Sequence, residues 1–189
     1  PCSLDLQRFE LKQTSWASKI VLGWTGTFSS KHYLDSIKST LYELDKFINM
    51  KIILITNFDY SLEGLDYEII RWKESSEISD LHKIDIGLYP LPNDPWVYGK
   101  SSLKALQYMA LGIPPVATAI GTTYRVIEDT KSGFLVNSES DWLEKLKLLI
   151  DNPDLRRDMG GEARSRVEEL YSVSANAPTY LSIFRSVYE

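Results

Sequence analysis

Short apolar runs alternate with amphipathic segments along most of this 189-residue chain. Six runs have the length and the β-branched content of buried strands, and helical spacing marks the segments between them. The expected strands are 20–24, 51–56, 67–71, 85–89, 114–118 and 133–136. A chain that alternates in this way buries its strands as a parallel sheet with helices on both faces.

The expected helices are 32–49, 74–82, 101–111, 123–129, 140–151, 153–171 and 175–187. The predicted fold is therefore α/β, a Rossmann-like doubly wound parallel sheet of about six strands. Residues 1–18 lack periodicity, so we expect a linker or leading arm before one domain at 19–189. Ligands of such sheets bind beyond the carboxyl ends of the strands. Three loops, 25–31, 90–100 and 119–122, have that position.

Composition narrows the class of protein. A net charge of −5 and a pI near 5.2 argue against general nucleic-acid binding. The single cysteine, Cys2, excludes an internal disulfide framework and fits a reducing compartment. There is no apolar run of bilayer length and no signal peptide, so we expect a cytoplasmic protein. Because the chain starts at Pro1 rather than Met, we interpret it as a fragment or processed form.

The segment 101–111 carries signals for both ends of a helix. A serine oxygen of Ser101 or Ser102 can cap its start. Gly112 tolerates the left-handed conformation of a helix stop. The residues expected to face the core by helical spacing are Leu103, Leu106, Met109 and Ala110.

The other side of this helix is predicted to be polar, with Lys100, Lys104 and Gln107 in line. Cations at a helix start oppose the helix dipole, which indicates that an anion binds there. Free N–H groups together with lysine charge can form a phosphate cradle. Two simply solvated lysines are an equally valid interpretation of this pattern alone.

The loop after the first strand offers Gly26, Thr27, Ser29 and Ser30. Glycine allows close backbone approach to a ligand, and Ser29 or Ser30 is placed to cap the next helix. The loop is neither a G-x-G-x-x-G fingerprint nor a Walker loop, so a plain strand-to-helix turn is the alternative. Together with the 90–100 loop it would form one anion pocket.

Other site chemistries find little support in the sequence. The two histidines, His32 and His82, have no cysteine pair to complete a zinc site. There is no D-x-D signature for a metal–diphosphate complex and no G-x-S-x-G elbow. Trp72 ends a strand and is a candidate for lining a base pocket, although tryptophans more often lie in cores or domain contacts.

Several segments of the sequence resemble those of a known family. Residues 99–116 resemble the donor-binding segment of family 4 glycosyltransferases (group 1, GT-B type). Further matches follow in the family's order along the chain, and they comprise 1–9, 21–27, 85–92, 133–136 and 151–160.

The resemblance implies two Rossmann-like domains with the active site between them. This chain would be the carboxyl-terminal domain, which binds a nucleotide-diphosphate sugar, and a missing amino-terminal domain would bind the acceptor. Transfer would be of the hexosyltransferase type, with retention and without a metal or other cofactor. Contact with a membrane, at the inner face, would arise only through the other domain.

The resemblance also implies roles for single residues. Gly26 and Thr27, with Ser29, Ser101, Ser102 and Lys104, would hold the diphosphate, and Gln107 would bind the ribose. We expect Lys100 to stabilise the leaving diphosphate as the glycosidic bond breaks, which makes it the catalytic candidate.

The chain departs from the family pattern at two places. The family's E-x7-E motif would put glutamates at 99 and 107, where this chain has Gly99 and Gln107. An amide can still hydrogen-bond ribose hydroxyls, whereas glycine cannot replace the first glutamate. The family's Arg/Lys pair in the first loop is reduced to Lys31. Two alternatives remain: a degenerate domain that binds nucleotide or a partner without catalysis, and an unrelated receiver or flavin domain.

Overall fold

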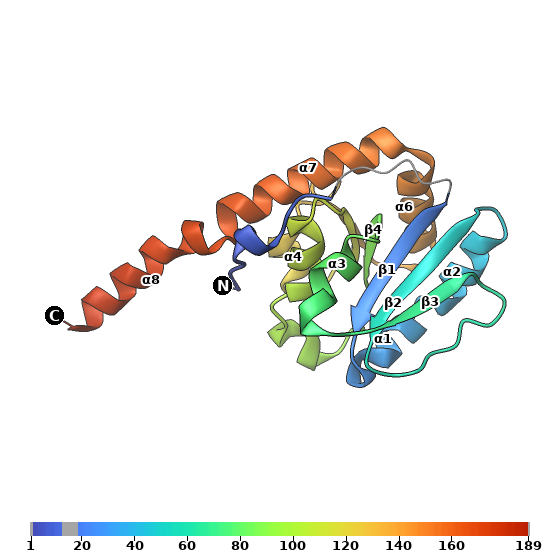
Figure 1. The fold of residues 1–189 in the computed structure, drawn as a ribbon, viewed down its shortest axis with the longest axis horizontal. Helices are drawn as coiled ribbons and strands as arrows, with labels where there is room; N and C mark the ends of the chain where they lie inside the picture. Colours follow the sequence, from blue (N-terminus) through green and yellow to red (C-terminus); the bar gives the residue numbers. More distant parts are fainter. Residues whose placement is uncertain (1, 13–18, 189) are drawn as a thin grey trace.

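In the computed structural model, six parallel strands of the described residues form one sheet in the order β3-β2-β1-β4-β5-β6. Figure 1 labels four of them, β1 to β4. The structure describes residues 2–12 and 19–188. The strands are β1 (Ile20–Gly26), β2 (Met50–Thr56), β3 (Tyr67–Arg71), β4 (Ile86–Tyr89), β5 (Pro115–Thr118) and β6 (Phe134–Val136). The predicted doubly wound sheet is confirmed, and each strand lies within two residues of its expected bounds.

Helices cover both faces of the sheet. One face packs against α3 (Glu77–Leu81), α4 (Leu103–Ala110) and α7 (Pro153–Leu170). The other face packs against α1 (Lys31–Asp35), α2 (Lys38–Asp45) and α6 (Glu139–Asp151). Two apolar clusters result, one on each side, because the central strands bury side chains toward both layers. A short helix, α5 (Thr123–Val126), follows β5.

The helix predicted over 32–49 is wrong in one respect, because it is two helices. The break falls at Ser36 and Ile37, between α1 and α2. The Ser36 hydroxyl donates to the carbonyl of Tyr33 at 2.7 Å, and the Ile37 N–H bonds the carbonyl of Leu34. Side-chain bonds of this local type compete with helix continuation. The helix predicted over 74–82 likewise begins as a 3₁₀ turn, η3 (Glu74–Ser76), before α3.

The described part of the leading arm, residues 2–12, packs on the domain. Leu4 and Phe9 are buried, and Leu4 forms a parallel bridge with Ser172. The Lys12 ammonium makes an ion pair with Asp85 at 2.5 Å, and the backbone N–H of Lys12 donates to the carbonyl of Leu111. The rest of the predicted arm, 13–18, lies outside the described residues. The division into arm and domain stays a prediction.

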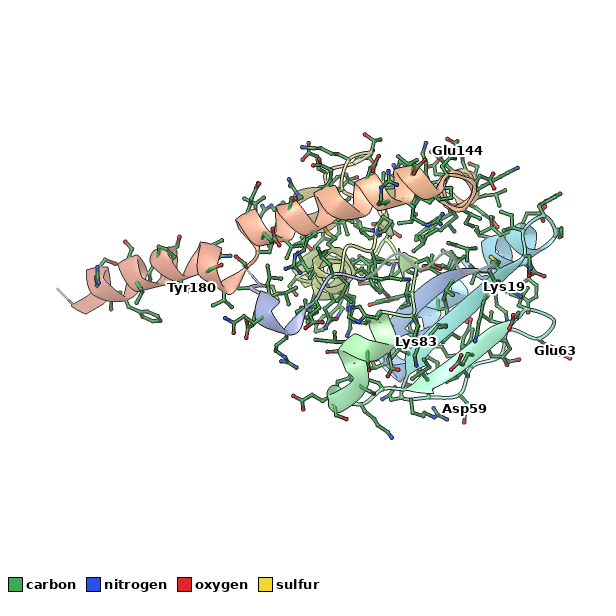
Figure 2. The ribbon with its side chains drawn as sticks, turned by 45° about the horizontal axis from the view of Figure 1, so that its top comes forward. Lys19, Asp59, Glu63, Lys83, Glu144 and Tyr180 are labelled. Atoms are coloured by element: carbon green, nitrogen blue, oxygen red, sulfur yellow. The ribbon has the colours of Figure 1, made fainter. Side chains whose placement is uncertain are left out.

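The last helix, α8 (Val173–Tyr188), projects away from the rest of the chain (Figure 1). Figure 2 places Tyr180 on this projecting part. Several large apolar side chains of α8 are exposed, including Leu181, Ile183, Phe184 and Val187. α8 therefore differs from α4 and α6, whose apolar faces are packed against the sheet.

Candidate functional site

A cleft opens where the strand order reverses, between the carboxyl ends of β1 and β4. Two adjoining cavities of about 200 Å³ and 510 Å³ share Tyr89, Lys100 and Lys104 as lining residues. Open α/β sheets bind ligands at such a reversal. The cleft has this position because the chain leaves β1 on one side of the sheet and β4 on the other.

The first loop lines the smaller cavity with Gly26, Thr27 and Ser29. Its backbone groups are largely satisfied internally, since the Thr27 N–H donates to Ser30 Oγ at 3.1 Å and Ser30 Oγ donates back to the Thr27 carbonyl. Ser30 stands at the start of α1 without capping it, so the predicted cap by Ser29 or Ser30 is wrong. The Ser30 hydroxyl is used by the turn itself.

Packing requires a glycine at position 26. A Cβ at this position would lie 2.3 Å from the indole ring of Trp24 and 2.7 Å from Ser30 Oγ. Trp24 is almost fully buried and cannot move aside easily. The glycine that the sequence pattern assigns to ligand approach therefore also makes room for a core tryptophan.

The segment before α4 supplies the other wall. Lys100 is extended rather than helical, and Ser102 adopts a left-handed conformation with φ of 57°. Thr122, in the third loop, holds this segment: its Oγ1 donates to the Lys100 carbonyl at 2.5 Å and lies 2.6 Å from Ser102 Oγ. The predicted cap by Ser101 or Ser102 is wrong, because the Ser102 hydroxyl points to Thr122 and no described side chain caps α4.

The interior of α4 follows the predicted spacing with one exception. Leu106, Met109 and Ala110 are fully buried as expected, whereas Leu103 is 36% exposed at the cavity wall. Leu103 is the first helical residue, where the helix has not yet reached the core. Gly112 ends the helix with φ of 73°, as predicted. The uncapped first turn leaves the start of α4 open to a ligand.

The cavity lining is positively charged. Lys100 and Lys104 line both cavities, and no Asp or Glu is among the described residues that do so. Lys100 Nζ lies 5.2 Å from the centre of the Tyr33 ring, a cation–π distance, and no described carboxylate forms an ion pair with it. Burial raises the pKa of Tyr89 to about 12, although a Ser102 hydrogen bond opposes the rise, so this phenol stays neutral. An acidic chain thus presents a cationic cleft.

Lys104 has a partner that the sequence interpretation did not include, Glu77 of α3. The two side chains form an ion pair at 3.4 Å, and Glu77 Oε1 also accepts from Trp72 Nε1 at 3.0 Å. Burial raises the pKa of Glu77, but hydrogen bonds from Trp72 and Gln107 and the charge of Lys104 outweigh it and lower the pKa overall. No sequence signal identified Glu77, because α3 meets α4 only in the fold.

Gln107 lies beside this carboxylate and is 5% exposed. It is not among the residues that line the two cavities. Its Oε1 is buried without a hydrogen-bond partner among the described residues. Trp72, at the end of β3, is 45% exposed and is joined to the same carboxylate. The fold therefore gathers Trp72, Lys104 and Gln107 around the Glu77 carboxylate, and of these residues Lys104 lines the cleft.

Lys31 does not contribute to the cavities. Its ammonium pairs with Asp35 at 2.9 Å and lies 5.1 Å from the centre of the Tyr60 ring. The positive charge of the cleft thus comes from Lys100 and Lys104, as the sequence interpretation allowed for.

Comparison with known proteins identifies the family. The family model described as "Glycosyl transferases group 1" matches residues 69–166, which is more than half of the chain. The chain belongs to the group 1 glycosyl transferases. The match includes Trp72, Glu77 and the whole of α4, and it leaves the first loop outside.

Individual relatives agree with this assignment. A trehalose synthase from Pyrococcus horikoshii is 29% identical over 85 residues, which cover 45% of this chain and 20% of that protein. The C-terminal domain of a glycosyl transferase group 1 family protein (LpcC) from Francisella tularensis aligns with a TM-score of 0.71 and 22% identity, covering 90% of this chain and 100% of that one. Anabaena Alr3699/HepE, solved with UDP and glucose, aligns with a TM-score of 0.73 and 14% identity, covering 97% and 55%.

These solved structures share the fold, one Rossmann-like half of the GT-B type. The predicted membership of the group 1 glycosyl transferases is thus confirmed, and so is the predicted fold. The chain spans about half the length of HepE and matches a fifth of the trehalose synthase.

Two further features, a membrane-spanning helix and a cluster of metal ligands, are absent from residues 2–12 and 19–188. No helix in these ranges is long and apolar enough to cross a bilayer. No group of three or more His, Cys, Asp or Glu side chains there could hold a metal ion.

Proposed function

We propose that this chain binds the nucleotide-diphosphate sugar donor of a retaining hexosyltransferase. The observation that carries the proposal is the cationic cleft at the strand-order reversal, lined by Gly26, Thr27 and Ser29 on one side and by Lys100 and Lys104 on the other. A diphosphate is negatively charged and has acceptor oxygens, so it complements the lysine ammonium groups that line the cleft. The HepE structure, which shares the fold, was solved with UDP and glucose.

Lys100 is the proposed catalytic group. Its ammonium stands at the junction of both cavities and has no described carboxylate partner, so its charge is available to an anion. When the glycosidic bond breaks, negative charge develops on the leaving diphosphate, and a fixed cation there lowers the barrier. No described carboxylate lines the cavities to act as a nucleophile. The two lysines supply the charge that other transferases take from a metal, so we expect metal-independent binding.

The acceptor side of the reaction is proposed to lie on a further, amino-terminal domain. The chain covers 55% of the HepE chain, and the exposed apolar side chains of α8 are suited to contact with another domain. Under this proposal the complete enzyme acts in the cytoplasm, and any membrane contact at the inner face arises through that domain.

Calorimetric titration of the chain with UDP, GDP and ADP, with and without magnesium, tests the donor proposal. One nucleoside diphosphate should bind with micromolar or tighter affinity, and magnesium should not change it. Lys147→Ala is the matched control for Lys100→Ala in this titration, because this exposed lysine of α6 does not line the cleft. The absence of binding by all three nucleotides would contradict the proposal.

A domain that binds nucleotide without catalysis is the second candidate. Gly99 favours it, because this lining residue has no side chain to contact the sugar. Turnover decides between the two candidates. A two-domain protein that transfers sugar to an acceptor is an enzyme, and the anomeric configuration of its product by NMR tests retention.

A further inference from the structure

The ammonium of Lys100 is held by an aromatic ring rather than by a carboxylate. Lys100 Nζ lies 5.2 Å from the centre of the Tyr33 ring, and no described carboxylate forms an ion pair with it. The other lysine of the cleft, Lys104, is paired with Glu77 at 3.4 Å. The two cations of one cleft are thus held by different chemistry, and this difference calls for a physical reason.

The backbone of Lys100 is fixed on both sides. Its N–H donates to the carbonyl of Val97 at 3.0 Å, and its carbonyl accepts from Thr122 Oγ1 at 2.5 Å. The side chain beyond is a flexible four-carbon stem, and ordering such a stem when a ligand binds costs conformational entropy. A contact that orders the stem in advance therefore strengthens the binding of an anion.

Tyr33 has the position and the rigidity to supply that contact. It lies on α1, directly after the first loop, and lines the smaller cavity together with Lys100. Tyr33 is only 8% exposed and packs in the apolar cluster on the α4 side of the sheet, whereas its neighbour Leu34 packs in the cluster on the other side. The ring therefore reaches from the first wall of the cleft to a cation of the second wall.

An aromatic ring orders a cation without cancelling its charge. A carboxylate beside Lys100 would repel an incoming diphosphate, whereas a ring has a quadrupole and no net charge. Lys31 gives the contrast, because it has both an Asp35 partner and the Tyr60 ring and lines neither cavity. The contact with Tyr33 thus leaves the full charge of Lys100 to an anion.

We propose that Tyr33 is a positioning residue, whose ring holds the Lys100 ammonium in place for the leaving diphosphate. The inference rests on the proposed function, because it requires that Lys100 binds that anion. Tyr33 acts through the lysine and forms no bond of its own to the ligand. A cation that is already in place needs no reordering as negative charge develops, so the ring supports both binding and the rate of transfer.

NMR of the chain with isotope-labelled lysine tests the contact without any nucleotide. A ring current shifts the protons above a ring upfield. The Lys100 ε-methylene resonance, assigned by its loss in Lys100→Ala, should therefore be displaced in the wild type and in Tyr33→Phe. Tyr33→Leu removes the ring and should return the resonance to the ordinary lysine position. An undisplaced Lys100 resonance in the wild-type chain would overturn the inference, and this result does not depend on whether Tyr33→Leu folds.

Calorimetric titration with UDP, GDP and ADP tests the consequence for binding. Tyr33→Leu should weaken binding of the preferred nucleotide by about fivefold, the scale of one partly exposed cation–π contact, and Tyr33→Phe should change it by less than about twofold. In the Lys100→Ala background Tyr33→Leu should have no further effect, since its partner is gone. Tyr60→Leu is the matched control and should keep the affinity, because Tyr60 is equally buried, also lies beneath a lysine and does not line the cleft.

The outcomes distinguish this inference from the donor proposal. If Tyr33→Phe weakens binding as much as Tyr33→Leu, the hydroxyl binds the ligand and the positioning role is wrong. Wild-type affinity in Tyr33→Leu, or equal weakening with and without Lys100, also overturns the inference and leaves the donor proposal intact. No binding of any nucleotide by the wild-type chain contradicts both. Chemical denaturation of each variant checks that its fold is retained.

Discussion

The two walls of the cleft are built in opposite ways. The first loop, 26–30, uses its own serine hydroxyls to satisfy its backbone and contributes shape. The segment 100–102 contributes charge, contains a left-handed serine, and is held in place by Thr122 of another loop. The first wall relies mainly on hydrogen bonds within its own turn, with one further bond from the Phe28 N–H to Asn57 Oδ1, whereas the second wall depends on a brace from another loop.

Gly26→Ala should have the largest effect, on the shape-giving wall. The new Cβ overlaps the buried Trp24 ring, so we expect a loss of about 3 kcal/mol in the free energy of unfolding. Chemical denaturation measures it. Gly99→Ala is the control, because a Cβ at that position would have no neighbour within 4 Å, and it should change stability by less than about 0.5 kcal/mol. Similar losses for both glycines would refute the packing argument.

Lys100→Ala should act on binding alone. Loss of a charged hydrogen-bond donor should weaken nucleoside-diphosphate binding by roughly 1.5–3 kcal/mol. Calorimetry measures the affinity, and the unfolding free energy should stay within about 0.5 kcal/mol of the wild type. An unchanged affinity would remove Lys100 from the site.

Thr122→Val tests the dependence of the charged wall on its brace. The variant keeps the shape but removes the hydroxyl that joins Lys100 and Ser102. We expect a loss of about 1 kcal/mol in stability, together with weaker diphosphate binding. Ser29→Ala in the first loop is a contrast in stability alone, since Thr27 and Ser30 still close that turn. Equal losses of stability from both changes would contradict the difference between the walls.

The smallest expected effect is a change in how the free energy of unfolding depends on pH in the acidic range. The folded-state pKa of Glu77 is lowered, so its contribution is present above the unfolded value near 4.5 and is lost as the pH falls through the folded pKa. Glu77→Gln should therefore differ from the wild type at neutral pH, and the difference should shrink as the pH falls below the unfolded value near 4.5. Denaturation at several pH values measures this. A gap that does not change with pH would show that the charge of Glu77 does not matter to folding.

The fold was predictable from the sequence because buried parallel strands are short, apolar and punctuated by turn residues. The same reasoning failed where a side chain has two competing partners. Ser102 was expected to cap α4, but its hydroxyl meets Thr122, twenty residues later in the chain. Ser36 breaks a helix that periodicity predicted as continuous.

The site was predictable to the extent that it follows local order. Gly26, Thr27, Ser29, Lys100 and Lys104 do line one cleft, because the reversal of strand order brings their loops together. Glu77 could not be found, since its meeting with Lys104 and Gln107 depends on how α3 packs against α4. The binding roles of all these residues stay predictions until a ligand is measured.

Tyr108 of α4 connects the two walls of the cleft, because it forms a hydrogen bond with β1. β1 and β4 pair at Leu22 and Gly23 only, and the Tyr108 hydroxyl then takes the place of a strand partner by accepting from the Thr25 N–H at 3.1 Å. The absence of a side chain at Gly87 gives its ring the space to do so. The Thr25 amide is thus protected by a helix rather than by the sheet. Its hydrogen exchange should follow the opening of α4, so both walls form and melt as one cooperative unit.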